Sequence, residues 1–318
     1  MRHFPTSFFS CLAVQLVIAA SCSHKGMSPE PDFCSRDSVL ICRSGASPFN
    51  SENAEVFIYD REDEALRLES FYTARIKNGK LALCSRSGRK RAVVIANMDC
   101  SDLQFEHFSS YAALDKVRAE LMEEDPSEPV LVGEIDFVDG SADIGCSIVM
   151  APLLCRVEIR FLDIDFGEQC YKDAVFENPR AYLTCLNASF PVCGGNMTCN
   201  ETLNDGAFDW FTLKNFRHPD MVYSRTAEGA VLYCYPGTDS RLVIEGEIEG
   251  NTYYYAMDIS QWAYGEKGKM KAGENYVFDI LLKRKGTTDP AICADPASIK
   301  IKLVRNPWIE KEDYDEEF

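Results

Sequence analysis

The chain has 318 residues, a formal net charge of −17 and a charged fraction of 26%. A surface this acidic repels nucleic acid and anionic lipid head groups, so we expect no nucleic-acid partner. The apolar fraction of 46% is ordinary for a globular chain of about two domains, and no segment after residue 21 is long and apolar enough to span a membrane.

The first residues are typical of an export signal. A basic Met1-Arg2-His3 precedes a mostly apolar stretch from Phe8 to Ala20, and small residues then lead to Cys22. The stretch is too short for a stable membrane-spanning helix. Its Ala-Ala-Ser-Cys ending resembles a bacterial lipobox, which predicts a signal peptide over residues 1–21 and acylation of Cys22, with palmitate as a typical chain. An ordinary signal peptide whose Cys22 joins a disulfide is the alternative.

A polar, proline-containing tether over residues 23–33 is followed by the first predicted strand. Val39, Leu40 and Ile41 form the centre of this strand, which runs from Ser38 to Cys42, and Arg43 opens the loop behind it. The next predicted strand, Ala54 to Asp60, is rich in β-branched and aromatic residues.

One helix is predicted within a series of strands. Strands at Lys80–Cys84 and Arg91–Ala96 flank Ser85–Arg89, a stretch that predicts a hairpin loop. Ser109 or Ser110 is a suitable helix cap, and Tyr111, Leu114, Val117 and Leu121 recur at helical spacing before Asp125-Pro126.

Beyond Pro152 the pattern stays β. Alternating apolar residues predict strands at Leu154–Phe161, Leu242–Ile248, Tyr253–Ile259, Tyr276–Leu282 and Ile299–Val304, whereas Phe190 to Glu228 is expected to form long loops. The whole is therefore predicted to be mainly β, with two sandwiches that meet near residues 150–156.

Fourteen cysteines are unusual for a chain of this size. Cys193 and Cys199, which flank a Gly-Gly loop, are the most plausible local disulfide, but thiols that stay reduced as small buried apolar groups are the open alternative. No C-x-x-C occurs and the four histidines are scattered, so we expect no metal site.

Motifs of the common enzyme classes are absent from the sequence. It contains no G-x-S-x-G, Walker loop, H-E-x-x-H or dinucleotide-binding glycine pattern, so we expect neither an enzyme nor a cofactor. Asp163 and Asp165 are expected on the solvated face of a strand. Tyr253–Tyr255, with Trp262 and Tyr264, offer either a platform for sugar rings or ordinary core packing.

The order of these segments resembles the fimbrillin family, the subunits of Bacteroidales type V pili. The resemblance covers nearly the whole exported chain and rests on diffuse strand patterns. It is carried by Ala54–Asp60, Lys90–Asn97, the helix at Leu114–Met122, Pro152–Ile159, Asn275–Ile280, Lys285–Pro290 and Ile299–Trp308.

The resemblance implies a specific architecture. Residues 22–53 would form a lipidated leader with a removable first strand, residues 54–151 an N-terminal domain, and residues 152–318 a C-terminal domain. Both domains would be transthyretin-like β-sandwiches, with one helix inserted in the first.

The resemblance also implies a mode of assembly. An Arg-specific protease would cut after Arg43 and remove the strand that contains Val39, Leu40 and Ile41. A strand of another fimbrial subunit would fill the exposed edge. Ile299, Ile301, Leu303 and Trp308 are the candidate donor residues, and an ordinary last strand of the second domain is the equal alternative.

The predicted function is therefore a stalk or tip subunit of an adhesive surface fimbria. It would begin as an outer-membrane lipoprotein and bind an unknown receptor on a host or bacterial surface. Two alternatives stay open: an anchor subunit that retains its lipid, and a surface glycan-binding lipoprotein that uses Trp210 or Trp262.

Overall fold

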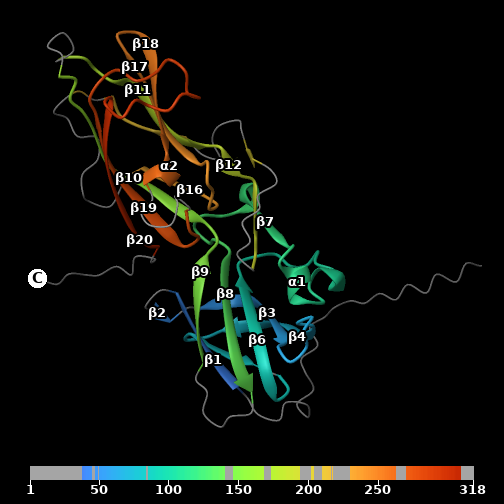
Figure 1. Cartoon of the computed structure of the whole chain (residues 1–318). Helices are drawn as coiled ribbons and strands as arrows, with labels where there is room; N and C mark the ends of the chain where they lie inside the picture. The colour runs from blue at the N-terminus through green and yellow to red at the C-terminus, as the bar shows by residue number, and fades with distance from the viewer. Residues whose placement is uncertain are drawn as a thin grey trace, which may run out of the picture.

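The structure is a computed structural model, and strands dominate it (Figure 1). We divide the chain into an N-terminal region, residues 38–152, and a C-terminal region, residues 153–308, which lie end to end. The prediction of a mainly β protein is confirmed. The residues that the structure describes are 38–44, 47–48, 50–83, 85–139, 146–167, 173–193, 202–203, 210–215, 217, 230–262 and 270–308.

The described residues of the N-terminal region form nine strands and three short helical segments. They are β1 (Ser38–Ser44), β2 (Ser47–Pro48), β3 (Ser51–Asp60), β4 (Leu68–Ile76), β5 (Lys80–Leu83), β6 (Gly88–Ala96), η1 (Phe105–His107), α1 (Tyr111–Leu114), β7 (Arg118–Glu120), η2 (Leu121–Glu123), β8 (Leu131–Asp139) and β9 (Cys146–Pro152).

These strands form two layers joined at one corner. The order β4-β3-β6-β8 makes one layer, and β8 pairs with β9 only at Leu131↔Pro152 and Val132↔Ala151. From there β9 runs beside β1, whose other edge carries β5 and β2. Between the layers lies the N-terminal core, formed by Leu40, Cys42, Ala54, Val56, Ile58, Ile76, Leu81, Leu83, Ala92, Val94, Ala96, Leu131, Phe137, Ile148 and Met150.

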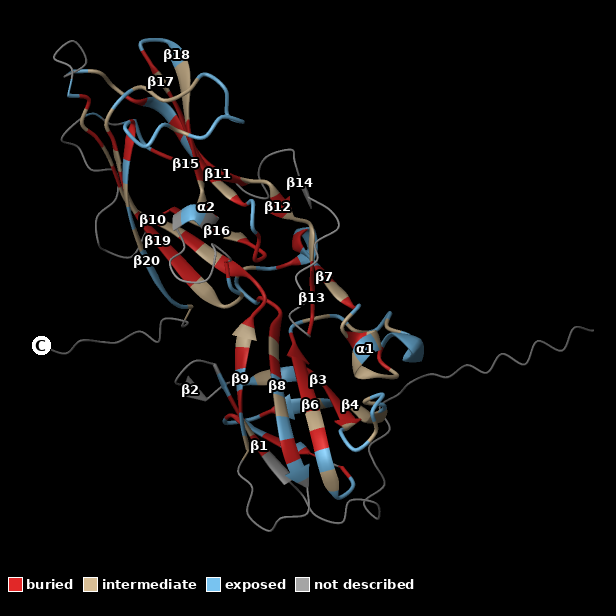
Figure 2. Cartoon of the chain, in the orientation of Figure 1, coloured by how far each residue is buried: buried red, intermediate tan, exposed pale blue. Residues whose placement is uncertain are grey.

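Strand β3 is buried on both faces, which explains why its apolar residues run consecutively. Val56 and Ile58 point into the N-terminal core, whereas Phe57 and Tyr59 point into a second core on the opposite face. This second core, the large core, continues into the C-terminal region, so one cluster of buried apolar residues connects the two regions. Buried residues, red in Figure 2, occur in both regions.

The C-terminal region is a sandwich of two four-stranded sheets with orders β16-β10-β19-β20 and β15-β11-β17-β18. Alternating side chains of both sheets fill the large core between them, as Val157, Ile159, Leu242 and Ile244 illustrate. The elements are β10 (Cys155–Ile164), β11 (Glu177–Thr184), β12 (Leu186–Asn187), β13 (Ser189–Pro191), β14 (Thr202–Leu203), β15 (Trp210–Thr212), β16 (Ala230–Cys234), β17 (Arg241–Ile248), β18 (Asn251–Asp258), α2 (Ile259–Trp262), β19 (Glu274–Leu282) and β20 (Ile299–Pro307).

The predicted helix after Ser109 is mostly wrong. Ser110 does cap a helix, since its hydroxyl accepts a hydrogen bond from the backbone N–H of Ala113 at 3.2 Å, but α1 ends after one turn at Leu114. The chain then extends as β7 and pairs with β13 of the C-terminal region. Val117, Ala119 and Leu121 are all buried, as every second residue of an extended segment with one apolar face would be. The extended form is therefore favoured over a longer helix, and it lets the segment connect the two regions.

The predicted hairpin between β5 and β6 is also wrong. Strand β5 pairs with β1, and β6 pairs with β3 and β8 in the other layer. The stretch Ser85–Ser87, before β6 begins at Gly88, therefore connects the layers, and Leu81 and Leu83 of β5 share the N-terminal core with Ala92 and Val94 of β6.

A buried carboxylate also links the two regions. The Glu124 carboxylate accepts hydrogen bonds from the Tyr235 hydroxyl at 2.9 Å and from the backbone N–H of Val130 at 3.0 Å. Burial raises the pKa of Glu124 above the usual glutamate value, since desolvation outweighs both hydrogen bonds. Because Tyr235 follows β16, this contact fixes the end of the N-terminal region against the C-terminal sandwich.

Candidate functional site

The candidate site is β1 together with the two strands that hold it. Residues Ser38–Ile41 pair antiparallel with Leu83–Lys80 of β5, and Leu40–Ser44 pair parallel with Cys146–Met150 of β9. Strand β1 therefore lies inside a sheet, with backbone hydrogen-bonding partners on both edges. Its removal would leave two facing edges of unpaired donors and acceptors, a groove that another strand can fill.

Two side chains of β1 fill the space between β5 and β9. Leu40 and Cys42 are fully buried in the N-terminal core, next to Leu81 and Leu83 of β5 and to Ile148 and Met150 of β9. Full burial of an aliphatic side chain stabilises a fold by about 1.5–3 kcal/mol, so Leu40 contributes a large share of the docking of so short a strand. Burial also raises the pKa of the Cys42 thiol to about 11, so this thiol stays protonated and behaves as an apolar group.

The residues predicted for the removable strand fall within β1, but the inward positions were only partly foreseen. Leu40 points into the core, Ile41 is half-buried on the opposite face, and the side chain of Val39 lies outside the described residues. Cys42 was missed as a core residue. The alternation from Leu40 to Cys42 is the signal that identifies it.

Arg43, the predicted processing residue, is exposed at the end of β1. Its backbone is paired on both sides, opposite Pro48 of β2 and Val149 of β9, and Ser44 is paired in the same way with Ser47 and Met150. The Arg43 side chain is thus accessible, whereas the backbone on both sides of the Arg43–Ser44 peptide bond is held in the sheet. Cleavage at this bond would require this end of β1 to separate from its neighbours.

The predicted donor residues lie on β20, one of the two outer strands of its sheet. This strand pairs antiparallel with β19 from Leu282↔Ile299 to Glu274↔Pro307. Ile299 is buried, Ile301 and Leu303 are half-buried against the large core, and the Trp308 ring packs on Tyr233 at a centroid distance of 5.4 Å. In the monomer these residues therefore form the ordinary last strand of the sandwich.

The remaining predicted site residues are placed only in part. Cys193 is buried and burial raises its pKa, whereas Cys22 and Cys199 lie outside the described residues. The side chains of Trp210 and Trp262 also lie outside them. Tyr255 is fully buried in the large core, where its hydroxyl donates a hydrogen bond to the carbonyl of Arg284 at 2.9 Å, so core packing accounts for it.

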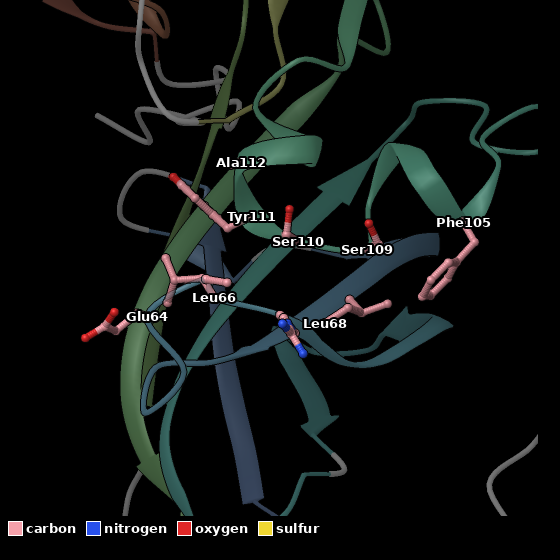
Figure 3. Close-up of a pocket in the computed structure, with 10 residues that line it drawn as sticks. Glu64, Leu66, Leu68, Phe105, Ser109, Ser110, Tyr111 and Ala112 are labelled. Carbon is pink, nitrogen blue, oxygen red and sulfur yellow. The ribbon is translucent and has the colours of Figure 1, made fainter.

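A second surface feature lies beside α1 (Figure 3). It is an open depression of about 680 Å³, and the ring of Phe105, 65% exposed, stands at its rim. The Phe105 ring packs edge-on against Phe108 at a centroid distance of 5.7 Å, which holds it in place. The lining residues are Glu64, Ala65, Leu66, Arg67, Leu68, Phe105, Ser109, Ser110, Tyr111 and Ala112.

In the described part of the chain, no group of three or more His, Cys, Asp or Glu side chains is arranged to hold a metal ion, and no helix has the length and apolarity to cross a bilayer. Asp165 forms an ion pair with Lys283.

Comparison with known proteins gives a consistent result at the level of the fold. No protein-family model and no curated protein matches the sequence. Among solved structures, a fimbrilin from Porphyromonas gingivalis W83 is similar with a TM-score of 0.60 and 12% identity, over 87% of this chain and 98% of the fimbrilin. The chain has the fimbrilin fold. The predicted resemblance is thereby confirmed for the fold.

Two further structures of this fold are similar. A candidate cell adhesion protein from Bacteroides eggerthii has a TM-score of 0.59 and 15% identity over 86% of this chain and 96% of its own. The tip fimbrial protein Mfa3 from Porphyromonas gingivalis has a TM-score of 0.51 and 9% identity over 86% of this chain and 100% of its own. These three structures are thus two fimbrial proteins and a candidate cell adhesion protein.

Proposed function

We propose that this protein is a structural subunit, stalk or tip, of an adhesive surface fimbria. It is exported as an outer-membrane lipoprotein acylated at Cys22, an Arg-specific protease cuts after Arg43, and a strand of another subunit then replaces β1. The fold shared with fimbrial proteins supports a structural role at the cell surface.

One observation carries the proposal: β1 lies between two strands of its sheet, yet only the chain at its C-terminal end links it covalently to the following strands. Its inward side chains Leu40 and Cys42 are fully buried between β5 and β9. The exposed Arg43 lies where β1 ends, so a single cut there separates this strand from the rest of the chain.

The donor in this proposal is the C-terminal segment that begins with β20. Ile299, Ile301 and Leu303 alternate with exposed Lys300 and Lys302, so the strand has one apolar face, as a groove between β5 and β9 requires. Because β20 has, among the described strands, a paired neighbour on one edge only, its release breaks fewer backbone hydrogen bonds than that of an inner strand.

The decisive experiment is limited cleavage of the purified, non-lipidated precursor with an Arg-specific protease, followed by N-terminal sequencing and electron microscopy. We expect a new N-terminus at Ser44, with fibres or SDS-resistant multimers. An Arg43→Ala variant should be uncut and monomeric, whereas Arg89→Ala, which changes another exposed arginine in a paired strand, should behave as wild type.

The other outcomes assign different roles. Cleavage at Arg43 without self-assembly identifies a tip or accessory subunit that needs partners. A precursor that stays intact under conditions that cut its unfolded form contradicts processing and indicates an anchor that retains its lipid.

A second candidate function is binding of a surface polysaccharide at the depression beside α1. The exposed Phe105 favours it, since an accessible aromatic face next to a hollow is suited to stacking a sugar ring. Saturable polysaccharide binding should be lost in Phe105→Ala and kept in Met122→Ala, which removes an equally exposed apolar side chain outside the depression. Equal binding by both variants contradicts this function.

A further inference from the structure

Two cysteines face each other across a strand pair of the C-terminal sandwich. Cys155 is the first residue of β10 and Cys234 the last residue of β16, and they are direct partners in the antiparallel register. Both side chains are fully buried. Among the register pairs of the described strands, this is the one that joins two cysteines, since Cys42 is opposite Ile148 and Cys146 is opposite Leu40.

The register places the two residues within bonding reach. Directly opposed residues of an antiparallel pair have Cα atoms about 4.5 or 5.5 Å apart, and a disulfide accepts Cα separations of about 4.4–6.8 Å. Their Cβ atoms lie about 4.5–5.5 Å apart, close to the disulfide range, so a small rotation of each side chain suffices. The neighbouring pairs Arg156↔Tyr233 and Val157↔Leu232 keep this register fixed.

The surroundings of the pair keep the Cys155 thiol protonated, since burial and the nearby Glu274 carboxylate both raise its pKa. The Cys155 Sγ lies 3.1 Å from the carbonyl oxygen of Lys271, and the Lys271 backbone N–H donates to the Tyr276 hydroxyl. Tyr276 is itself fully buried in the large core, so water has little access to the pair.

We propose that Cys155 and Cys234 form a cross-strand disulfide when the chain folds in an oxidising compartment. Both S–H bonds break and one S–S bond forms between the two sulfur atoms. The two electrons and two protons pass to an oxidant of the disulfide class, such as oxidised glutathione or a thiol oxidoreductase, which leaves as two thiols.

The burial of the pair determines when this bond forms. Thiol–disulfide exchange needs a thiolate and physical access, and burial raises the pKa of Cys155 well above its ordinary value. The exchange therefore takes place before the C-terminal sandwich closes, and the finished bond is shielded from reductants afterwards.

The bond would join an edge strand to an inner one. Strand β16 is the outer strand in the order β16-β10-β19-β20, and β10 is the strand that follows the junction between the regions. A link from residue 155 to residue 234 closes a long loop that contains β11 to β15, and long loops give disulfides their largest effect on the unfolded chain. This inference is independent of strand exchange at β1.

The test is to refold the non-lipidated chain from denaturant with oxidised glutathione and to isolate the monomer. The folded protein is then denatured, its free thiols are alkylated, and the non-reduced digest is analysed by mass spectrometry. We expect one linked peptide pair that joins Cys155 to Cys234, and a Tm about 5–15 °C higher than that of protein refolded with reductant.

Matched variants separate this bond from any other. The double variant C155A/C234A should lose this part of the redox-dependent Tm shift, whereas Cys42→Ala, which removes an equally buried thiol opposite an isoleucine, should keep it. Full alkylation of Cys155 and Cys234 in oxidatively refolded wild-type monomer overturns the proposal. Peptide mapping of the wild type decides the question even where the double variant fails to fold.

Discussion

Strands β1 and β10 occupy equivalent places in the two regions of the molecule. Each lies between one antiparallel and one parallel neighbour: β5 and β9 flank β1, whereas β16 and β19 flank β10. The backbone environment of the two strands is therefore nearly the same.

Their side chains and connections differ. Strand β1 has seven residues, with Leu40 and Cys42 fully buried, and the exposed Arg43 is its last residue but one. Strand β10 has ten residues and joins β9 through the buried Leu153 and Leu154. Its inward side chains are Cys155, Val157, Ile159, Leu162 and Ile164. A central position in a sheet thus does not by itself prevent a strand from leaving the fold. How firmly the strand is held depends on the apolar surface that it buries and on its covalent connections to neighbouring strands.

The largest expected difference in stability is between the same substitution, an aspartate for a buried aliphatic residue, made in β10 and in β1. Ile159→Asp places an unpaired carboxylate in the large core and should cost more than about 4 kcal/mol, so we expect no soluble folded protein. Leu40→Asp should expel β1 while the C-terminal sandwich stays folded. Soluble yield and two-dimensional NMR spectra of both variants test this, and equal loss of folding in both contradicts a separable β1.

A milder substitution measures the docking of β1 directly. Leu40→Ala should weaken the strand by about 2–5 kcal/mol, so cleavage after Arg43 by a fixed amount of Arg-specific protease should accelerate at least about tenfold. The matched control is Val138→Ala, which trims an exposed side chain of β8 and should leave the cleavage rate unchanged. An unchanged rate for Leu40→Ala would show that cleavage does not depend on the release of β1.

Two glycines allow a sharper test of the groove. A Cβ at Gly133 would lie 2.7 Å from Ile148 Cγ1 and 2.8 Å from Met150 Sδ, and a Cβ at Gly246 would overlap the ring of Phe176. Each change to alanine should cost about 1–3 kcal/mol in the intact chain. After removal of β1 we expect a smaller penalty for Gly133→Ala, because Ile148 and Met150 can move into the vacated space, and the same penalty for Gly246→Ala. Chemical denaturation of the cut and uncut proteins measures both, and parallel changes at the two sites contradict the comparison.

The smallest effect is a pH dependence at the junction between the regions. Because the folded-state pKa of Glu124 is raised, the unfolded chain loses its proton first as pH rises, so this residue removes stability between the ordinary glutamate value of about 4.3 and its higher folded value. Glu124→Gln should lack this loss, and its stability relative to wild type should increase across that interval. Denaturant titrations at a series of pH values measure it, with Glu123→Gln, an exposed neighbour, as the control. A constant difference between variant and wild type would rule out titration of Glu124.

The strands with strong local patterns were predictable from the sequence. Val56 to Tyr59 form β3 because consecutive β-branched and aromatic residues suit a strand with a core on each face, and Tyr276 to Leu282 of β19 alternate as expected. The prediction of a long helix after Ser110 was wrong because the spacing of Leu114, Val117 and Leu121 is compatible with two structures. It fits a continuous helix with a period of 3.6, and it fits equally well the single helical turn followed by a strand that the chain adopts.

Long-range pairing was beyond sequence reasoning. Nothing local to Leu40 indicates that its partners are Leu81 and Cys146, and the parallel contact with β9 joins segments about a hundred residues apart. The opposition of Cys155 and Cys234 depends on such a register. The position of β1 in its sheet therefore became visible only with the structure.

The opposed directions of β5 and β9 have a consequence for the polarity of a fibre. Because β1 is antiparallel to one wall and parallel to the other, any strand inserted there meets one wall of each kind, whichever way it points. Main-chain hydrogen bonds therefore give almost no preference between a donor and its reverse. In the proposed assembly, the side-chain pockets that Leu40 and Cys42 fill therefore determine which way the incoming strand points. The spacing of apolar residues on that strand would then set the direction in which the fibre grows.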